Sequence, residues 1–104
     1  MHKVVYLPLA ERDLMEALDY LVSKLDAPQA ARDLLDELDQ TVQQIAAFPY
    51  ACALYRTERP MRDEIRMTPV RNYVLYYAVY PDRVEIRRFL HGHRDRSRGI
   101  GDEA

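Results

Sequence analysis

The stretch Tyr73–Leu90, YVLYYAVYPDRVEIRRFL, decides the fold. Its first part, Tyr73–Tyr80, is nearly all aromatic or β-branched, which is the composition of a central β-strand. Pro81 and Asp82 then mark a turn, and Val84–Leu90 alternates enough to be the second strand of a hairpin. The segment therefore predicts two neighbouring antiparallel strands.

The start of the chain predicts a strand followed by an amphipathic helix. Lys3–Leu7 is a short apolar-leaning run that stops at Pro8, where the helix begins. Apolar residues then recur at the spacings that one buried helical face requires. They are Leu14, Ala17, Leu18, Leu21, Val22 and Leu25. The opposite, polar face is expected to carry Glu11, Arg12, Asp13, Glu16, Asp19 and Lys24.

A second helix is predicted after a short connection. Asp26 is the candidate N-cap, with Pro28 near the first helical position and Gln29 three residues after the cap. The helix ends at Phe48–Pro49, because proline disfavours helical geometry in the residue before it. Its apolar stripe is Ala31, Leu34, Leu35, Leu38, Val42 and Ile45. Since the connection is short, the two helices should pack antiparallel as a hairpin.

The region after the second helix loses its helical period. Tyr50–Arg62 predicts a long loop, and Met61–Met67 is expected to form a strand with Ile65 facing the core. Pro69 should interrupt that strand before a turn at Arg71–Asn72.

The order of elements predicts an α+β fold. We expect an N-terminal strand, an antiparallel helical hairpin, and then a three-stranded antiparallel meander, with the strands in one sheet. The 104 residues, 48% of them hydrophobic, suit a single domain over residues 1–104. Residues 96–104 are expected to be a flexible tail, because Ile100 is the one core-forming residue after Gly92.

Composition excludes several classes of protein. A single cysteine, Cys52, excludes an internal disulfide framework and a cysteine-based zinc site, and it suits a reducing compartment. No apolar run approaches the roughly 18 residues that span a bilayer, and Met1–Ala10 lacks the pattern of a signal peptide. We therefore expect a cytoplasmic protein without membrane contact.

The charges are separated along the chain. Residues 1–52 hold 4 bases and 9 acids, whereas residues 53–98 hold 11 bases, all arginine, and 6 acids. Arginine binds phosphate or carboxylate through a planar fork and stacks on flat rings, so its exclusive use suggests recognition. The alternative is an arginine-rich genome that uses arginine for every surface charge.

A surface of arginine and tyrosine is expected on the sheet face that the helices leave free. Such a surface can bind phosphates through arginine and stack bases or partner side chains on tyrosine. The alternative is that the tyrosines complete a small core and the arginines solvate it. This face should show some of Tyr73, Tyr76, Tyr77, Tyr80, Arg87, Arg88 and His91.

The densest polar cluster is His91–Asp95, HGHRD. No metal site is expected, because alternate strand residues point apart and Gly92 breaks the geometry. His91 and His93 beside Arg94 could perform acid–base chemistry on a phosphodiester, with arginine stabilising the developing charge. The alternative is a polar strand end in which Asp95 pairs with a neighbouring arginine. We expect no cofactor.

Taken in order, these pieces resemble the RelE/ParE superfamily of toxins from type II toxin–antitoxin modules. The likeness runs from about Tyr6 to Asp95. It rests on LPLAERDL at 7–14, Ala30, Ala31 and Leu34, Phe48–Pro49, RNYVLYY at 71–77 and VEIRRFLHGHRD at 84–95. The resemblance implies a bacterial toxin with a cognate antitoxin that wraps it.

The superfamily divides by target, and the resemblance leaves two targets open. RelE-like mRNA interferases, which act on the translating ribosome, typically have an arginine directly after the tyrosine of the third strand, where this chain has Val74. The pieces NYVLYY and LHGHRD are more similar to ParE-like toxins, which block DNA gyrase without cutting RNA. We therefore expect a ParE-like gyrase inhibitor, with a RelE-like endoribonuclease or a non-toxic binding domain as alternatives.

The candidate site residues follow from both arguments. His91, His93 and Arg94 would be catalytic only in a ribonuclease. The candidates for binding the target or the antitoxin are Arg66, Arg71, Tyr73, Arg87, Arg88 and Arg94, with Arg56 and Arg59 as a secondary rim.

Overall fold

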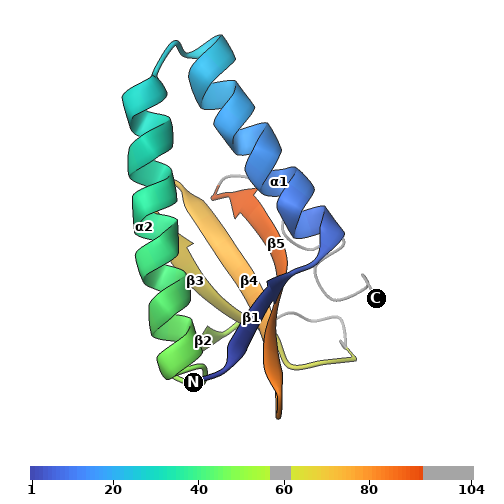
Figure 1. Ribbon diagram of the computed structural model, residues 1–104. Coiled ribbons are helices and arrows are strands. Elements are labelled where there is room, and N and C mark those ends of the chain that lie inside the picture. The colour runs from blue at the N-terminus through green and yellow to red at the C-terminus, as the bar shows by residue number, and fades with distance from the viewer. Residues whose placement is uncertain (57–61, 93–104) are drawn as a thin grey trace.

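The computed structural model of the protein describes residues 1–56 and 62–92 and contains two helical arms over one sheet (Figure 1). The helical elements are α1 (Pro8–Asp19), the π-helical turn η1 (Tyr20–Lys24) and α2 (Pro28–Ala47). The strands are β1 (Lys3–Tyr6), β2 (Ala53–Leu54), β3 (Arg66–Val70), β4 (Tyr73–Tyr80) and β5 (Arg83–His91). The α+β class predicted from the sequence is confirmed. The predicted tail 96–104, His93, Arg94 and Arg59 lie outside the described residues.

The five strands form one mixed sheet in the order β1-β5-β4-β3-β2. The predicted meander is β3, β4 and β5, which pair antiparallel, and β1 joins the sheet by pairing parallel with β5. Two details differ from expectation: the loop after α2 contains the short strand β2, and Pro69 lies inside β3. Proline is tolerated there because β2 pairs only with Arg66 and Met67, which leaves the outer edge of β3 open at Pro69.

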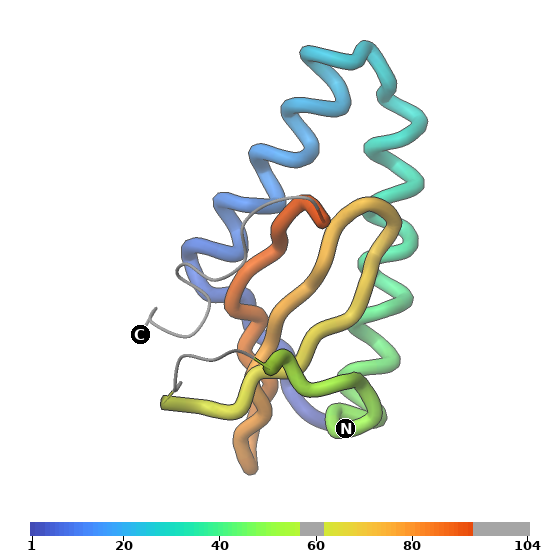
Figure 2. The backbone as a smooth tube through the Cα atoms, turned by 180° about the vertical axis from the view of Figure 1, so that it is seen from behind, coloured from blue at the N-terminus to red at the C-terminus, as the bar shows by residue number. Residues whose placement is uncertain are grey.

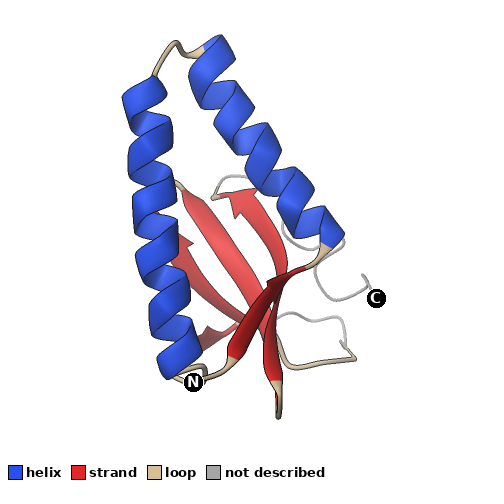
Figure 3. Cartoon of the chain, in the orientation of Figure 1, coloured by secondary structure: helices blue, strands red, loops and turns tan. Residues whose placement is uncertain are grey.

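Both helices cover the same face of the sheet, as Figures 1 and 3 show. Seen from behind in Figure 2, the opposite face carries no helix. The helices diverge from their connection as an open V rather than lying closely parallel (Figure 1). The predicted hairpin is therefore present, but its arms are splayed.

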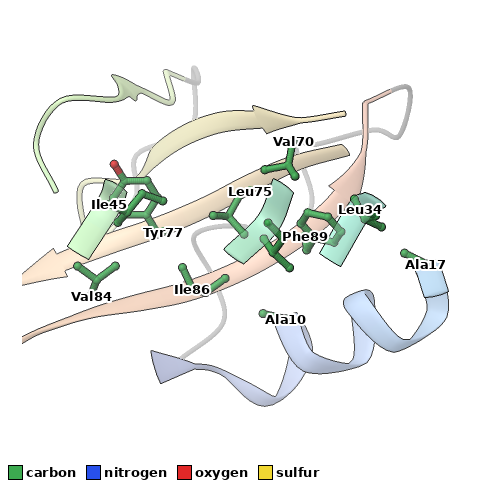
Figure 4. Packing of buried hydrophobic residues seen from close by; sticks show 11 residues of the cluster. Ala10, Ala17, Leu34, Ile45, Val70, Leu75, Tyr77, Val84, Ile86 and Phe89 are labelled. Atoms are coloured by element: carbon green, nitrogen blue, oxygen red, sulfur yellow. The ribbon is translucent and has the colours of Figure 1, made fainter. Parts of the chain in front are cut away.

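The main core lies between the helices and the sheet (Figure 4). Ala10 and Ala17 of α1 are buried against the strands, because their small side chains let the helix approach closely. From α2, Leu34 and Ile45 are each 1% exposed, and burial of one such side chain contributes about 1.5–3 kcal/mol.

The predicted stripe of the first helix is wrong at its end. Val22 is 47% exposed and Leu25 is 53% exposed. The chain widens into η1 at Tyr20, which shifts the angular positions of the residues that follow. The tip of the V also extends beyond the strands in Figure 1, so the end of this helical arm has no sheet beneath it.

The start of α2 also differs from the sequence prediction. Its N-cap is Ala27, which makes no side-chain capping hydrogen bond, and Asp26 has a positive φ of 50° instead of capping the helix. Pro28 does lie in the first helical turn, as expected.

The face of the sheet without helices carries a second apolar cluster. Residues alternate across β4, so Tyr77 belongs to the helix-side core while Tyr76 points to the other face. Both tyrosines are fully buried, which overturns the expectation that they could form part of an open surface. Ile65 is 1% exposed and packs in this second cluster, so its predicted burial is confirmed, but the strand predicted over Met61–Met67 is wrong in its bounds, since β3 begins at Arg66.

In the described ranges, no helix is both long enough and apolar enough to cross a membrane.

Candidate binding surface

Most of the predicted site residues that are described come from β3, β4 and β5. Arg66 begins β3, Tyr73 begins β4, and Arg87, Arg88 and His91 lie on β5. Arg71 occupies the turn between β3 and β4 with a positive φ of 55°. The contacts of these side chains divide them into anchors, which bind other parts of the chain, and an open end of the sheet.

Arg88 is an anchor between β5 and α1. Its Nε and Nη2 donate to the two carboxylate oxygens of Asp13 at 2.7 and 3.1 Å, and the backbone N–H of Phe89 donates to the same carboxylate at 3.0 Å. β1 pairs with β5 only as far as Ile86, so β1 does not pair with β5 at Phe89. The Asp13 carboxylate therefore takes the place of a strand partner for the backbone N–H of Phe89. Asp13 is 7% exposed, which overturns its assignment to the polar helix face.

The spacing of α1 contains the signal that the sequence prediction missed. Asp13 lies three residues after Ala10 and four before Ala17, and all three side chains are buried. An acid at a core-facing helical position needs a buried cation or several donors. Arg88, 75 positions later, supplies the cation.

Arg87 is a second anchor, on the face away from the helices. It is 4% exposed, so its predicted place on an open surface is wrong. Its Nη2 donates to Asp63 at 3.0 Å and to the hydroxyl of Tyr80, and its Nε lies 3.4 Å from a Glu85 oxygen. Arg87 follows Glu85 by two residues on the same face of β5, and it lies at a β-bulge, because Tyr76 pairs with Arg88 and Tyr77 with Ile86.

Arg66 holds the corner that follows α2. Its Nη1 donates to the carbonyl oxygens of Cys52 at 2.8 Å and Tyr50 at 3.2 Å, and its guanidinium lies 5.2 Å from the centre of the Tyr50 ring. From β4, the Tyr77 hydroxyl donates to the carbonyl oxygen of Pro49 at 2.9 Å. Burial is the main reason that the pKa of Tyr77 is raised above its ordinary value. The backbone of this corner is therefore fixed by side chains from two strands.

The open end of the sheet consists of Arg71, Tyr73 and His91. The Tyr73 ring stacks on Phe89 with 4.9 Å between the ring centres, and it packs edge-to-face with the His91 ring at 5.4 Å. Burial raises the pKa of Tyr73. The Arg71 side chain is 46% exposed and lies 3.8 Å from Glu37, whose carboxylate also accepts from the Arg71 backbone N–H at 3.0 Å.

A small hollow lies beside this open end, between the arms of the V. Its volume is about 90 Å³, and Leu21, Ala30, Leu34, Arg71, Asn72 and Tyr73 line it. Gly92 closes the end of β5, where its N–H donates to Asn72 O at 2.8 Å. A Cβ at Gly92 would meet that oxygen at 3.3 Å, so a larger residue would push the two segments apart.

These contacts limit the chemistry of the described residues. Arg66, Arg87 and Arg88 bind carboxylates or carbonyl oxygens of the chain itself. Among residues 1–56 and 62–92, no group of three or more side chains is arranged to hold a metal ion. Of the predicted arginines on or between β3, β4 and β5 in the described residues, Arg71 is the most exposed, and it lies at the same end of the sheet as the Tyr73 and His91 rings. This open end suits recognition of a partner by charge and ring contacts.

Comparisons with known proteins identify the family. Residues 4–96 match the model of the ParE toxin of type II toxin–antitoxin systems, parDE. Among solved structures, one described as the chromosomal ParDE toxin–antitoxin system from P. aeruginosa superposes with a TM-score of 0.69 at 18% identity, covering 88% of this chain and 96% of that one. No curated protein matches the chain. Since the family model spans most of the sequence, the chain belongs to the ParE toxin family of type II toxin–antitoxin systems.

Proposed function

We propose that the protein inhibits DNA gyrase and is neutralised by a cognate antitoxin. The observation that carries the proposal is the match of residues 4–96 to the ParE toxin model. ParE-like toxins resemble this chain in the segments NYVLYY and LHGHRD, and their action requires binding rather than bond cleavage. A gyrase inhibitor acts where gyrase is, so we also propose the cytoplasm as its location.

The arrangement of the arginines supports binding over catalysis. An endoribonuclease needs an acid and a base at the scissile phosphate, with cations free to stabilise the developing charge. In the described residues, Arg66, Arg87 and Arg88 are engaged by the chain itself. In the described residues the His91 ring packs against the Tyr73 ring, with the ring centres 5.4 Å apart.

We propose that the open end contacts the target or the antitoxin. The open end consists of Arg71, Tyr73 and His91. Arg94 follows His91 by three positions in the sequence and lies outside the described residues. The half-exposed Arg71 can pair with a carboxylate, and Tyr73 offers a ring edge for packing. Arg66, Arg87 and Arg88 support this surface from within the fold.

The test runs two assays on one preparation of the purified protein. Gyrase supercoiling should be inhibited, and mRNA on translating ribosomes should stay intact. Cleavage of the mRNA with normal supercoiling would instead assign the RelE-like activity. In cells, induced expression should stop growth, and co-expression of the neighbouring gene should restore it. Normal growth with abundant protein would point to the non-toxic binding domain.

A further inference from the structure

The turn between β3 and β4 places an arginine where glycine or asparagine is the usual residue. Val70 pairs with Tyr73, so Arg71 and Asn72 form a two-residue hairpin loop. Arg71 is the first loop residue and has a φ of 55°. Loops of this length favour a positive φ at that position, which glycine adopts without steric cost and a long side chain does not. A strained arginine there needs a contact that holds it, and its retention suggests a use for the side chain.

The contact that holds the loop comes from Glu37 on α2, 34 positions earlier in the chain. Glu37 Oε2 accepts from the backbone N–H of Arg71 at 3.0 Å, an ordinary hydrogen-bond length. The carbonyl of Asn72 accepts from the N–H of Gly92 at 2.8 Å. The loop is therefore fixed both from α2, beside which it lies in Figure 2, and from the end of β5.

The side-chain pair between Glu37 and Arg71 is looser than this backbone hydrogen bond. Arg71 Nη1 lies 3.8 Å from Glu37 Oε1, which is longer than the about 2.7–2.9 Å of a charge-assisted hydrogen bond. The two side chains are 46% and 44% exposed, so water reaches both. The guanidinium can therefore move from Glu37 to another carboxylate while the backbone hydrogen bond keeps the loop in place.

We propose that Glu37 is a positioning residue, which holds the Arg71 loop by its backbone and occupies the guanidinium until a carboxylate of a partner protein replaces it. This inference rests on the proposed function, in which the open end is the contact surface. Residues 1–52 hold 9 acids against 4 bases, so a phosphate backbone would bring repeated negative charge against the acidic helices. A protein segment can present a single carboxylate. It can also place an apolar side chain in the hollow beside Arg71, where Leu21 and Leu34 form part of the wall.

Amide hydrogen exchange of the purified full chain, read by NMR, tests the hold on the loop. Glu37→Gln keeps an oxygen that can accept from the Arg71 N–H, so this amide should stay as protected as in the wild type. Glu37→Ala removes the acceptor, and the amide should exchange at least about tenfold faster, the factor that one hydrogen bond to a charged group is worth. Asp36→Asn is the matched control, because Asp36 is exposed on the same helix and should leave the exchange unchanged. Equal exchange in Glu37→Ala and the wild type would overturn the proposal.

Binding of the antitoxin encoded by the neighbouring gene tests the competition for the guanidinium. Glu37→Gln should tighten this binding by about two- to fivefold at low salt, because one exposed ion pair no longer competes. The gain should shrink as salt rises, and in an Arg71→Gln background the same substitution should bring no gain. Unchanged or weaker binding by Glu37→Gln would overturn the proposal, and so would a gain that persists without Arg71.

The outcomes for Glu37 are separate from those for the proposed function. A wild-type chain that binds the antitoxin without inhibiting gyrase would refute gyrase inhibition, and the Glu37 variants would still decide the role of this residue. If growth inhibition and neutralisation are intact and the Glu37 variants behave as the wild type, only this inference is refuted. A wild-type chain that binds no antitoxin would refute the proposed neutralisation together with the partner carboxylate.

Discussion

Replacement of Asp13 by alanine tests whether one buried carboxylate fastens α1 to the sheet. The substitution removes the acceptor for three donors, which are Nε and Nη2 of Arg88 and the backbone N–H of Phe89. Loss of one partner from a buried ion pair typically costs about 3–5 kcal/mol, because the other partner loses that compensation while it stays largely shielded from water, as Arg88 is at 17% exposure. That is a large share of the roughly 5–15 kcal/mol that stabilises a domain.

The expected result is a large fall in melting temperature. For a domain of this size each 1 kcal/mol lowers Tm by about 4–8 °C, so a loss of about 3–5 kcal/mol should lower the Tm of Asp13→Ala by about 12–40 °C. Urea unfolding, followed by circular dichroism, gives the free energy directly.

Two further variants separate the ion pair from general damage to the helix. Glu16→Ala is the control, because Glu16 is exposed on the same helix and should change the free energy of unfolding by less than about 0.5 kcal/mol. In Asp13→Ala/Arg88→Met the buried cation is also removed, so part of the loss should be recovered. If Asp13→Ala unfolds within about 0.5 kcal/mol of the wild type, the carboxylate does not fasten α1 and the reasoning is wrong.

Four other variants should differ in their effects on toxicity and stability. Arg71→Glu should abolish growth inhibition with little change in Tm. Arg87→Glu should abolish growth inhibition and also lower Tm, because Arg87 is 4% exposed and paired with Asp63. Growth and melting are measured side by side, and an Arg87→Glu protein as stable as the wild type would contradict the role of Arg87 as an anchor. His91→Ala/His93→Ala should remain toxic and inhibit gyrase in vitro if the toxin acts by binding, whereas an RNase would lose on the order of a hundredfold in cleavage rate. Tyr77→Phe should destabilise the fold by about 1–2 kcal/mol in urea, since the buried Pro49 carbonyl loses its donor; an unchanged midpoint would show that water replaces it.

The elements of the fold could be predicted locally because their signals are local. The β-branched and aromatic run at 73–80 is a strand in the structure, and the proline at the start of each helix lies in the first helical turn, as expected. The predicted burial of Val22 and Leu25 was wrong, because burial at the end of the helix depends on how far the sheet extends beneath it. The periodicity of the helix carries no information about the extent of the sheet.

The candidate site was predicted less well, because residue type does not reveal what a side chain contacts. Arg71 and Arg87 are the same residue in the same basic half of the sequence. Arg71 lies on a turn and is half-exposed, whereas Arg87 lies within β5 and is covered by its contacts with Asp63 and Tyr80.

By itself the sequence determined the α+β class, the order of the elements, the separation of charge between helices and strands, and the resemblance to RelE/ParE toxins. These follow from periodicity, turn residues and composition, each readable within a few neighbouring positions. Only the tertiary structure decided that Asp13 and Arg88, 75 positions apart, form one buried pair, and that Arg71 rather than Arg87 stays accessible. The physical reason is that burial and pairing depend on which distant segments share a face, and that is fixed by strand register and helix placement rather than by local sequence.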